Sequence, residues 1–184
     1  MAKQQACATG PILWFSLCNL TNTMNLTFER SSKIQVPVSA LRQWHFEKDA
    51  FERLMPPWEK VNIIEFPGEL TNGCRAVFQV GMGPIKQTWI AEHEITETGF
   101  IDRQVEGPFA FWEHHHRFLS LGADSSRLVD SISYRLPFGV LGRIFGIPIV
   151  RSKLNRLFRY RHEVTREALE NGPPHSAGAT SHEN

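Results

Sequence analysis

The chain has 184 residues with 41% hydrophobic and 11% aromatic content, and its formal net charge is +1. This length fits one domain with tails, and the apolar fraction is sufficient for a sizeable core. A charge this close to zero disfavours nucleic acid as the main partner, because phosphate binding needs a basic face. The three cysteines, Cys7, Cys18 and Cys74, lie far apart. Such a set fits a reducing, cytoplasmic location better than a disulfide framework.

The two ends differ in composition from the middle. Residues 12–20 read ILWFSLCNL, an apolar run that is too short to span a bilayer and is not followed by a small-residue cleavage site. We therefore favour a poorly ordered extension over residues 1–23, with a secretory signal as the less favoured alternative and Met24 as an alternative start. Residues 171–184 have the composition of a disordered tail. One domain is expected over residues 24–170.

The domain begins with a strand and two short helices. Apolar and polar residues alternate from Leu26 to Val36, and Pro37 follows, which predicts a strand. Residues 40–46 and 50–55 then read ALRQWHF and AFERLM, and Pro56-Pro57 ends the second of them. These segments predict two short helices in succession.

Six further strands follow at hairpin spacing. They are predicted over residues 60–66, 74–82, 85–96, 100–106, 109–118 and 127–136, and the segments between them are rich in Gly, Pro, Asn and Asp. Successive strands joined by short turns, with no helix between them, indicate an antiparallel meander. The sheet should therefore have seven antiparallel strands.

The last element is an amphipathic helix over residues 149–170, preceded by a glycine-punctuated linker that reads LPFGVLGRIFGIP. Its apolar residues recur at spacings of three and four, so one stripe has to be buried against the sheet. The linker carries Phe138, Leu141 and Phe145, and it is expected either to gate a cavity or to plug one end of the sheet. The fold class is therefore α+β, a curved seven-stranded sheet wrapped around a long C-terminal helix.

The segment GPFAFWEHHHRF, residues 107–118, is the most unusual of the predicted strands. With a period of two, Trp112, His114, His116 and Phe118 share one face and His115 lies on the other. Applying the same alternation to the neighbouring strands adds five inward residues: Trp89, His93, Asp130, Ile132 and Tyr134. A carboxylate at position 130 would lie about 5 Å from an imidazole of the histidine strand and could fix its tautomer.

The element order resembles the helix-grip fold of the START/Bet v 1-like (SRPBCC) superfamily. The segments WHFEKDAFERLMPPWEKV, GPIKQTWIAEH, GFIDRQVEGPFAFWEHHHRF and LVDSISYRLPFGVLGRIF are similar to bacterial members described as polyketide cyclase/dehydrase-like, coenzyme Q-binding START-like or cell division inhibitor-like. The resemblance covers about residues 25–169. It implies a hydrophobic cavity between the sheet and the C-terminal helix, and it implies no particular reaction.

We therefore expect non-covalent binding or transport of a small hydrophobic ligand, such as a polyketide-like aromatic, a quinone or a lipid. The candidate ligand-binding residues are Phe78, Trp89, His93, Trp112, His114, His116, Phe118, Asp130, Ile132, Tyr134, Phe138, Leu141, Phe145, Leu154, Phe158 and Arg161, with Asp102 and Gln104 as secondary candidates. His45 and His162 are not among them. One alternative is a cyclase, dehydrase or isomerase in which His114 or His116 pairs with Asp130 as base and Tyr134 donates. The other is a protein-interaction module.

No cofactor is expected. Two imidazoles on one face at His114 and His116, with His93 as a third, resemble a metal-binding set, yet no metal motif of the resembling proteins matches, so no metal is predicted. The last helix carries Arg151, Lys153, Arg156, Arg159, Arg161 and Arg166. A basic helix of this kind can contact an anionic membrane peripherally, although a solvated face is the simpler interpretation. The sequence does not determine the oligomeric state.

Overall fold

The computed structural model describes residues 24–82 and 85–172. Within these ranges it confirms the predicted order of one strand, two short helices, six strands and one long helix. The helices are α2 (Val38–Phe46), α3 (Ala50–Arg53) and α4 (Gly139–Glu170). The strands are β1 (Leu26–Ile34), β2 (Val61–Glu65), β3 (Arg75–Met82), β4 (Ile85–Thr96), β5 (Gly99–Glu106), β6 (Phe111–Gly122) and β7 (Ser125–Arg135).

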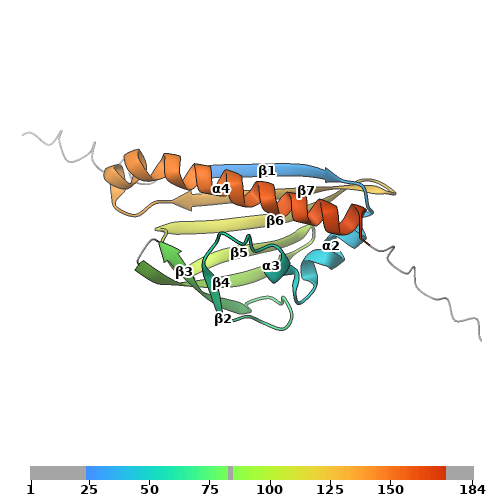
Figure 1. The fold of residues 1–184 in the computed structure, drawn as a ribbon, viewed down its shortest axis with the longest axis horizontal. Coiled ribbons are helices and arrows are strands. Elements are labelled where there is room, and N and C mark those ends of the chain that lie inside the picture. Colours follow the sequence, from blue (N-terminus) through green and yellow to red (C-terminus); the bar gives the residue numbers. More distant parts are fainter. Residues whose placement is uncertain (1–23, 83–84, 173–184) are drawn as a thin grey trace, which may run out of the picture.

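The seven strands form one antiparallel sheet in the order β1-β7-β6-β5-β4-β3-β2. From β7 back to β2 each strand pairs with its sequence neighbour, as expected of a meander, and β1 closes onto β7. The sheet curves, and α4 lies along the part of it formed by β1, β7 and β6 (Figure 1). α2 and α3 lie near the C-terminal end of α4 (Figure 1). This is the α+β helix-grip architecture that the sequence predicted.

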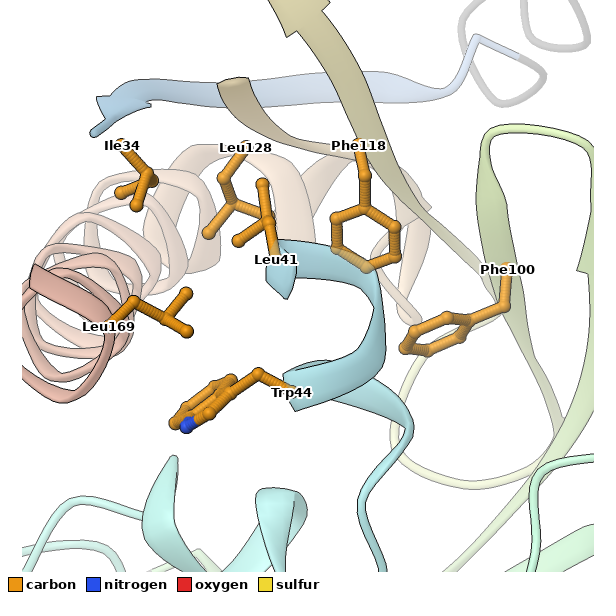
Figure 2. Packing of buried hydrophobic residues seen from close by; sticks show 7 residues of the cluster. All are labelled: Ile34, Leu41, Trp44, Phe100, Phe118, Leu128 and Leu169. Carbon is orange, nitrogen blue, oxygen red and sulfur yellow. The ribbon is translucent and has the colours of Figure 1, made fainter. Parts of the chain in front are cut away.

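Buried apolar side chains form three clusters, of which two include residues of α4 and the third contains Ala76, Phe78 and Ala91. The first joins α2 and the last turns of α4 to the sheet through Ile34, Leu41, Trp44, Phe100, Phe118, Leu128 and Leu169 (Figure 2). The second lies beneath the middle of α4 and contains Phe28, Ile132, Tyr134, Leu136, Leu154 and Phe158. The two clusters fix both ends of the concave face, and the polar side chains of β6 lie between them.

The long helix begins ten residues earlier than the sequence predicted. α4 starts at Gly139 and contains Pro148, so the prediction of a glycine-jointed loop over residues 136–148 is wrong. Pro148 lacks the N–H that would bond one turn back, but the helix continues through it. At Gly146 an added Cβ would lie 2.8 Å from Leu136 Cδ1, so the missing side chain lets this turn pack against Leu136.

Gly99, the first residue of β5, allows β5 and β6 to approach closely. A Cβ at this position would lie 1.9 Å from the carbonyl oxygen of His116. No other residue fits without separating the two strands. The close approach matters for the site because the next residue, Phe100, pairs with His116 in the sheet and stacks on its ring, with 4.1 Å between the ring centroids.

Among the helices of the described ranges, none combines the length and the apolar character needed to cross a membrane.

Candidate ligand-binding site

A cavity of about 80 Å³ opens between the α2–α3 segment and strands β3 to β6. Most of its wall is apolar. Phe51 of α3 stacks on Phe66 and Phe78, with ring centroids 5.2 and 4.7 Å away. The apolar lining residues are Phe46, Ala50, Phe51, Leu54, Phe66, Pro67, Leu70, Phe78, Ala91 and Phe100. The cavity therefore lies at the α2–α3 end of the concave face, and from α4 it is lined only by Arg161 among the described residues.

The inner end of this cavity is polar. His93, Asp102 and His116 line it from three adjacent strands, and His45 and Arg161 contribute from the helices. The side chains of His93 and His116 are only 6% and 10% exposed, whereas that of Asp102 is 23% exposed. An apolar cavity that ends in a few fixed polar groups is the usual form of a small-molecule site.

Strand register brings these polar groups together. His93 of β4 pairs with Asp102 of β5, and Asp102 pairs in turn with His114 of β6. Two residues after His114 on β6, His116 pairs with Asp130 of β7. Directly paired residues on one face have Cβ atoms about 5 Å apart. The backbone pairing thus places three histidines and two carboxylates in one patch.

Asp130 accepts hydrogen bonds from three imidazoles. Its Oδ1 lies 2.8 Å from Nε2 of His114 and 2.9 Å from Nδ1 of His116. Its Oδ2 lies 2.7 Å from Nε2 of His162, whose Nδ1 is 2.8 Å from the hydroxyl of Ser32. Asp130 is 3% exposed, so these contacts replace its hydration.

His116 bridges the two carboxylates. Its Nδ1 donates to Asp130 and its Nε2 donates to Asp102 Oδ2 at 3.0 Å. Burial disfavours the imidazolium, but Asp130 and Asp102 outweigh burial and raise the pKa of His116 to about 9. Burial likewise opposes the charge of Asp102, yet its contacts with His116 lower the pKa of Asp102 to about 2. The pKa of Asp130 is also held well below its usual value by His116, against the effect of burial.

The pKa values of two neighbouring histidines are lowered, in contrast to the raised pKa of His116. Burial, together with the positive charge of His116, lowers the pKa of His114 to about 4. Burial also lowers the pKa of His45 to about 4, and its Nδ1 donates to the carbonyl of Leu41 at 2.9 Å. At neutral pH His116 is therefore an imidazolium between two carboxylates, whereas His114 and His45 are neutral.

Arg161 is the cationic residue of α4 that faces the cavity. Its Nε donates to the carbonyl of Leu54 at 3.3 Å, and its guanidinium carbon lies 5.4 Å from the ring centroid of Phe158. Burial lowers the pKa of Arg161, and the field of Asp130 and Asp102 offsets part of this effect. Arg161 thus adds positive charge to the polar end without a direct carboxylate partner among the described residues.

The residues proposed from sequence fall into several groups. Phe78, His93, Asp102, His116 and Arg161 line the cavity, and His114 and Asp130 lie directly behind it. Others pack in the apolar clusters instead: Phe118 with Leu128 and Trp44, and Trp112, Ile132, Tyr134, Leu154 and Phe158 beneath α4. Trp89 packs edge-on against Trp112. Phe138 is 85% exposed, and the side chains of Leu141 and Phe145 lie outside the described part of the structure.

Gln104 has a local role. Its Nε2 donates to the carbonyl of Phe109 at 2.8 Å, and its Oε1 accepts from the N–H of Phe109 at 3.3 Å. Gln104 therefore ties the β5–β6 turn and does not line the cavity. Asp102, the other secondary candidate, is at the centre of the polar end.

Sequence reasoning missed two histidines. His162 is not among the sequence candidates, but it lies four residues after Phe158 on the buried face of α4 and contacts Asp130. Its helical spacing from Phe158 was the available signal. His45 is not among those candidates either. It stands four residues after the buried Leu41, and the sequence offers no direct indication that its ring reaches a cavity.

A metal ion could be held by three of these side chains. Asp102, His114 and His116 each offer one ligand atom, and these atoms lie within 4.8 Å of one another.

The curved sheet and the long C-terminal helix define a helix-grip protein, and its cavity lies between the α2–α3 segment and the sheet, not between the sheet and the C-terminal helix as the sequence predicted. A family model described as polyketide cyclase / dehydrase and lipid transport matches residues 34–158, more than half of the chain. The chain belongs to this family. A search of the curated proteins found no match.

Solved structures share the fold. A nucleoside-diphosphate sugar epimerase from Corynebacterium glutamicum is 27% identical over 78% of this chain, with a TM-score of 0.60, but this chain spans only 29% of that protein. A START superfamily protein from Mycobacterium smegmatis is 12% identical with a TM-score of 0.58, covering 79% of this chain and 97% of that one. The Zhui aromatase/cyclase from a Streptomyces species is 17% identical with a TM-score of 0.56, covering 80% and 98%. At these identities, the START superfamily protein and the Zhui aromatase/cyclase show only that they share the fold of this chain.

Proposed function

We propose that this protein binds one small, mostly apolar molecule non-covalently in the cavity between the α2–α3 segment and the sheet. The observation that carries this proposal is the arrangement of the cavity itself: an aromatic wall of Phe51, Phe66 and Phe78 leading to Asp102 and His116. Burial of apolar ligand surface contributes affinity at about 25 cal/mol per Å². The fixed charges at the inner end orient the ligand.

The size of the cavity favours a small ligand. Pockets for drug-sized molecules have volumes of about 300–1,000 Å³, and an apolar cavity of about 150 Å³ takes up benzene. The cavity here measures about 80 Å³. A molecule with a single aromatic ring requires less adjustment of the cavity than the three ligand classes expected from the sequence. A multi-ring polyketide, a tailed quinone or a lipid requires α3 or the β2–β3 loop to move outward.

The polar end favours a ligand with a hydroxyl group. Asp102 Oδ1 is buried and lacks a hydrogen-bond partner among the described residues, although His93 Nε2 approaches it to 3.1 Å in an orientation that is not a hydrogen bond. A ligand O–H can donate to this oxygen, while the ligand oxygen accepts from the guanidinium of Arg161. A phenol-like molecule combines this group with a ring for the aromatic wall.

The same geometry disfavours the enzyme alternative. A general base at neutral pH needs a free, basic atom. Both nitrogens of His116 are bonded to carboxylates, and its pKa of about 9 keeps it protonated. Asp102, with a pKa of about 2, is a weak base. Tyr134, the proposed donor, packs beneath α4 with Ile132 and Phe158 and does not line the cavity. His114, the other base proposed from the sequence, does not line the cavity. The cyclase, dehydrase or isomerase alternative is therefore less well supported than binding alone.

A protein-interaction module is also less well supported. That alternative fits a concave face filled entirely by large side chains. The part beneath the middle of α4, where Trp112 and Tyr134 pack together, is filled in this way, and so is the part around Trp44 and Phe118. The cavity at the α2–α3 end favours a small molecule. Peripheral contact of α4 with anionic lipid stays a prediction, which sedimentation with phosphatidylserine vesicles would test.

Protein-observed NMR with phenol as the probe tests the proposal. We expect amide shifts concentrated at the lining residues, around Phe78 and Asp102. Leu54→Trp, which fills the cavity from its rim, should abolish these shifts. Leu121→Trp, at a position that is 42% exposed and outside the cavity, should leave them unchanged. Shifts that persist in Leu54→Trp, or that map elsewhere, would show that the cavity is not the site.

A further inference from the structure

We propose that Asp102, His114 and His116 form a binding site for a divalent first-row transition metal ion. The facing atoms are Nδ1 of His114 and Nε2 of His116, which lie 3.9 and 3.0 Å from Oδ2 of Asp102. Ligand atoms at about 2.1 Å from an ion, set at a tetrahedral angle, are about 3.4 Å apart. The two distances bracket this value, so small rotations of the rings bring all three atoms onto one ion. The ion takes the place of the Nε2 proton of His116, which is released to solvent.

The opposite nitrogen of each ring is held as in known metal sites. A metal-binding histidine nearly always donates its other N–H to a carboxylate or a carbonyl, which fixes the ring and its tautomer. Nε2 of His114 and Nδ1 of His116 both contact Oδ1 of Asp130, at 2.8 and 2.9 Å. Asp130 is itself held by His162 at 2.7 Å. One buried carboxylate therefore aims both rings at Asp102.

His93 lies beside the three proposed ligands. Its Nδ1 lies 3.2 Å from the carbonyl oxygen of Cys74, which can only accept, so Nδ1 carries a proton. Its Nε2 faces Oδ1 of Asp102 at 3.1 Å, and that oxygen is buried without a hydrogen-bond partner among the described residues. An ion on Asp102 therefore has the ring of His93 within reach as a further nitrogen ligand.

The donor set identifies the class of ion. Two imidazoles and one carboxylate suit Zn²⁺ and Fe²⁺, whereas Mg²⁺ and Ca²⁺ prefer sites made only of oxygen. His116 and Asp102 also line the cavity, so an ion here keeps coordination positions open toward it. The inference does not depend on the organic ligand, because an ion can bind with the cavity empty.

Calorimetric titration of the full, untagged chain, first freed of metal with a chelator, tests the inference. Zn²⁺ is titrated in one series and Fe²⁺, under nitrogen, in another. We expect one ion to bind per chain with micromolar or tighter affinity. The ion that binds with the higher affinity is assigned to the site. X-ray absorption of the loaded protein should then report at least two imidazole nitrogens and a carboxylate oxygen. The absence of binding in both series would overturn the inference.

The affinity of variants at and near the three ligands tests where the ion binds. His114→Ala should weaken binding by more than about 100-fold, and Asp130→Asn, which changes only the support of the rings, by about 10- to 100-fold. His115→Ala is the matched control, because His115 lies on the same strand but on the opposite face, with its Nε2 on Glu113. Equal loss in His115→Ala would place the ion elsewhere and overturn the inference. If His114→Ala does not fold, the X-ray absorption spectrum of the metal-loaded wild type tests the site instead. A spectrum that shows no imidazole nitrogen bound to the ion would contradict the proposed site.

Discussion

The charge on His116 makes a strong prediction about stability at alkaline pH. In the folded chain its pKa is about 9, whereas the value for an unperturbed histidine is 6.5. A histidine with a raised folded-state pKa contributes stability that is fully present below the unfolded pKa and is lost as the pH rises through the folded pKa. The contribution of His116 should therefore be complete at pH 6.5 and absent above about pH 9.

The size of the effect follows from the same two values. A pKa difference from 6.5 to about 9 corresponds to about 3 kcal/mol. Because His116 is 8% exposed as a residue, solvent screens this interaction little. Domains of this kind have a total unfolding free energy of about 5–15 kcal/mol. The loss of about 3 kcal/mol between pH 6.5 and 9.5 is therefore easily measured.

The assay is equilibrium unfolding in urea across this pH range, with a chelator present so that no metal contributes. The wild type should lose about 3 kcal/mol. His116→Asn removes the titrating ring, so its unfolding free energy should be lower overall but nearly independent of pH in this range. His115→Asn, with the change on the outward face, should follow the wild type. A wild-type curve that is flat, or a variant curve that falls as steeply as the wild type, would refute the charge assignment.

Two further substitutions test the packing around the site. Gly99→Ala should lower the free energy of unfolding by more than about 2 kcal/mol, because the added Cβ would lie 1.9 Å from a carbonyl oxygen of β6. Gly68→Ala, where an added Cβ has no atom within 4 Å, should be nearly neutral. Equal losses for the two variants in urea unfolding would contradict the close approach of β5 and β6. Phe158→Ala should cost about 3–5 kcal/mol in urea unfolding because this ring is 1% exposed. A cost under about 1 kcal/mol would show that the region beneath α4 is loosely packed.

The strands could be predicted well from the sequence because alternation is a local signal. Each inward position of β6, from Trp112 to Phe118, follows from a period of two, and the short turns fix the neighbours of each strand. The same logic placed Asp130 beside the histidine strand. It also indicated that His115 faces outward, where its ring contacts Glu113.

The features that could not be predicted depend on packing between distant segments. Gly142, Gly146 and Pro148 are local helix breakers, yet α4 continues through them because its turns pack against residues such as Leu136. The location of the cavity depends on how α3 and the β2–β3 loop cover the sheet. The alternation of residues in β3 and β4 does not predict this packing. The contact between His162 and Asp130 joins residues 32 positions apart in the chain, and no periodicity specifies which strand a helix face will meet.

Native mass spectrometry of the purified protein, followed by solvent extraction and identification of the extract, tests the central claim most directly. The cavity predicts a reproducible small aromatic molecule bound to each chain of the wild type and of Leu121→Trp, and missing from Leu54→Trp. A wild-type protein that is purified bare and takes up no hydrophobic probe would contradict the claim that this protein binds a small ligand.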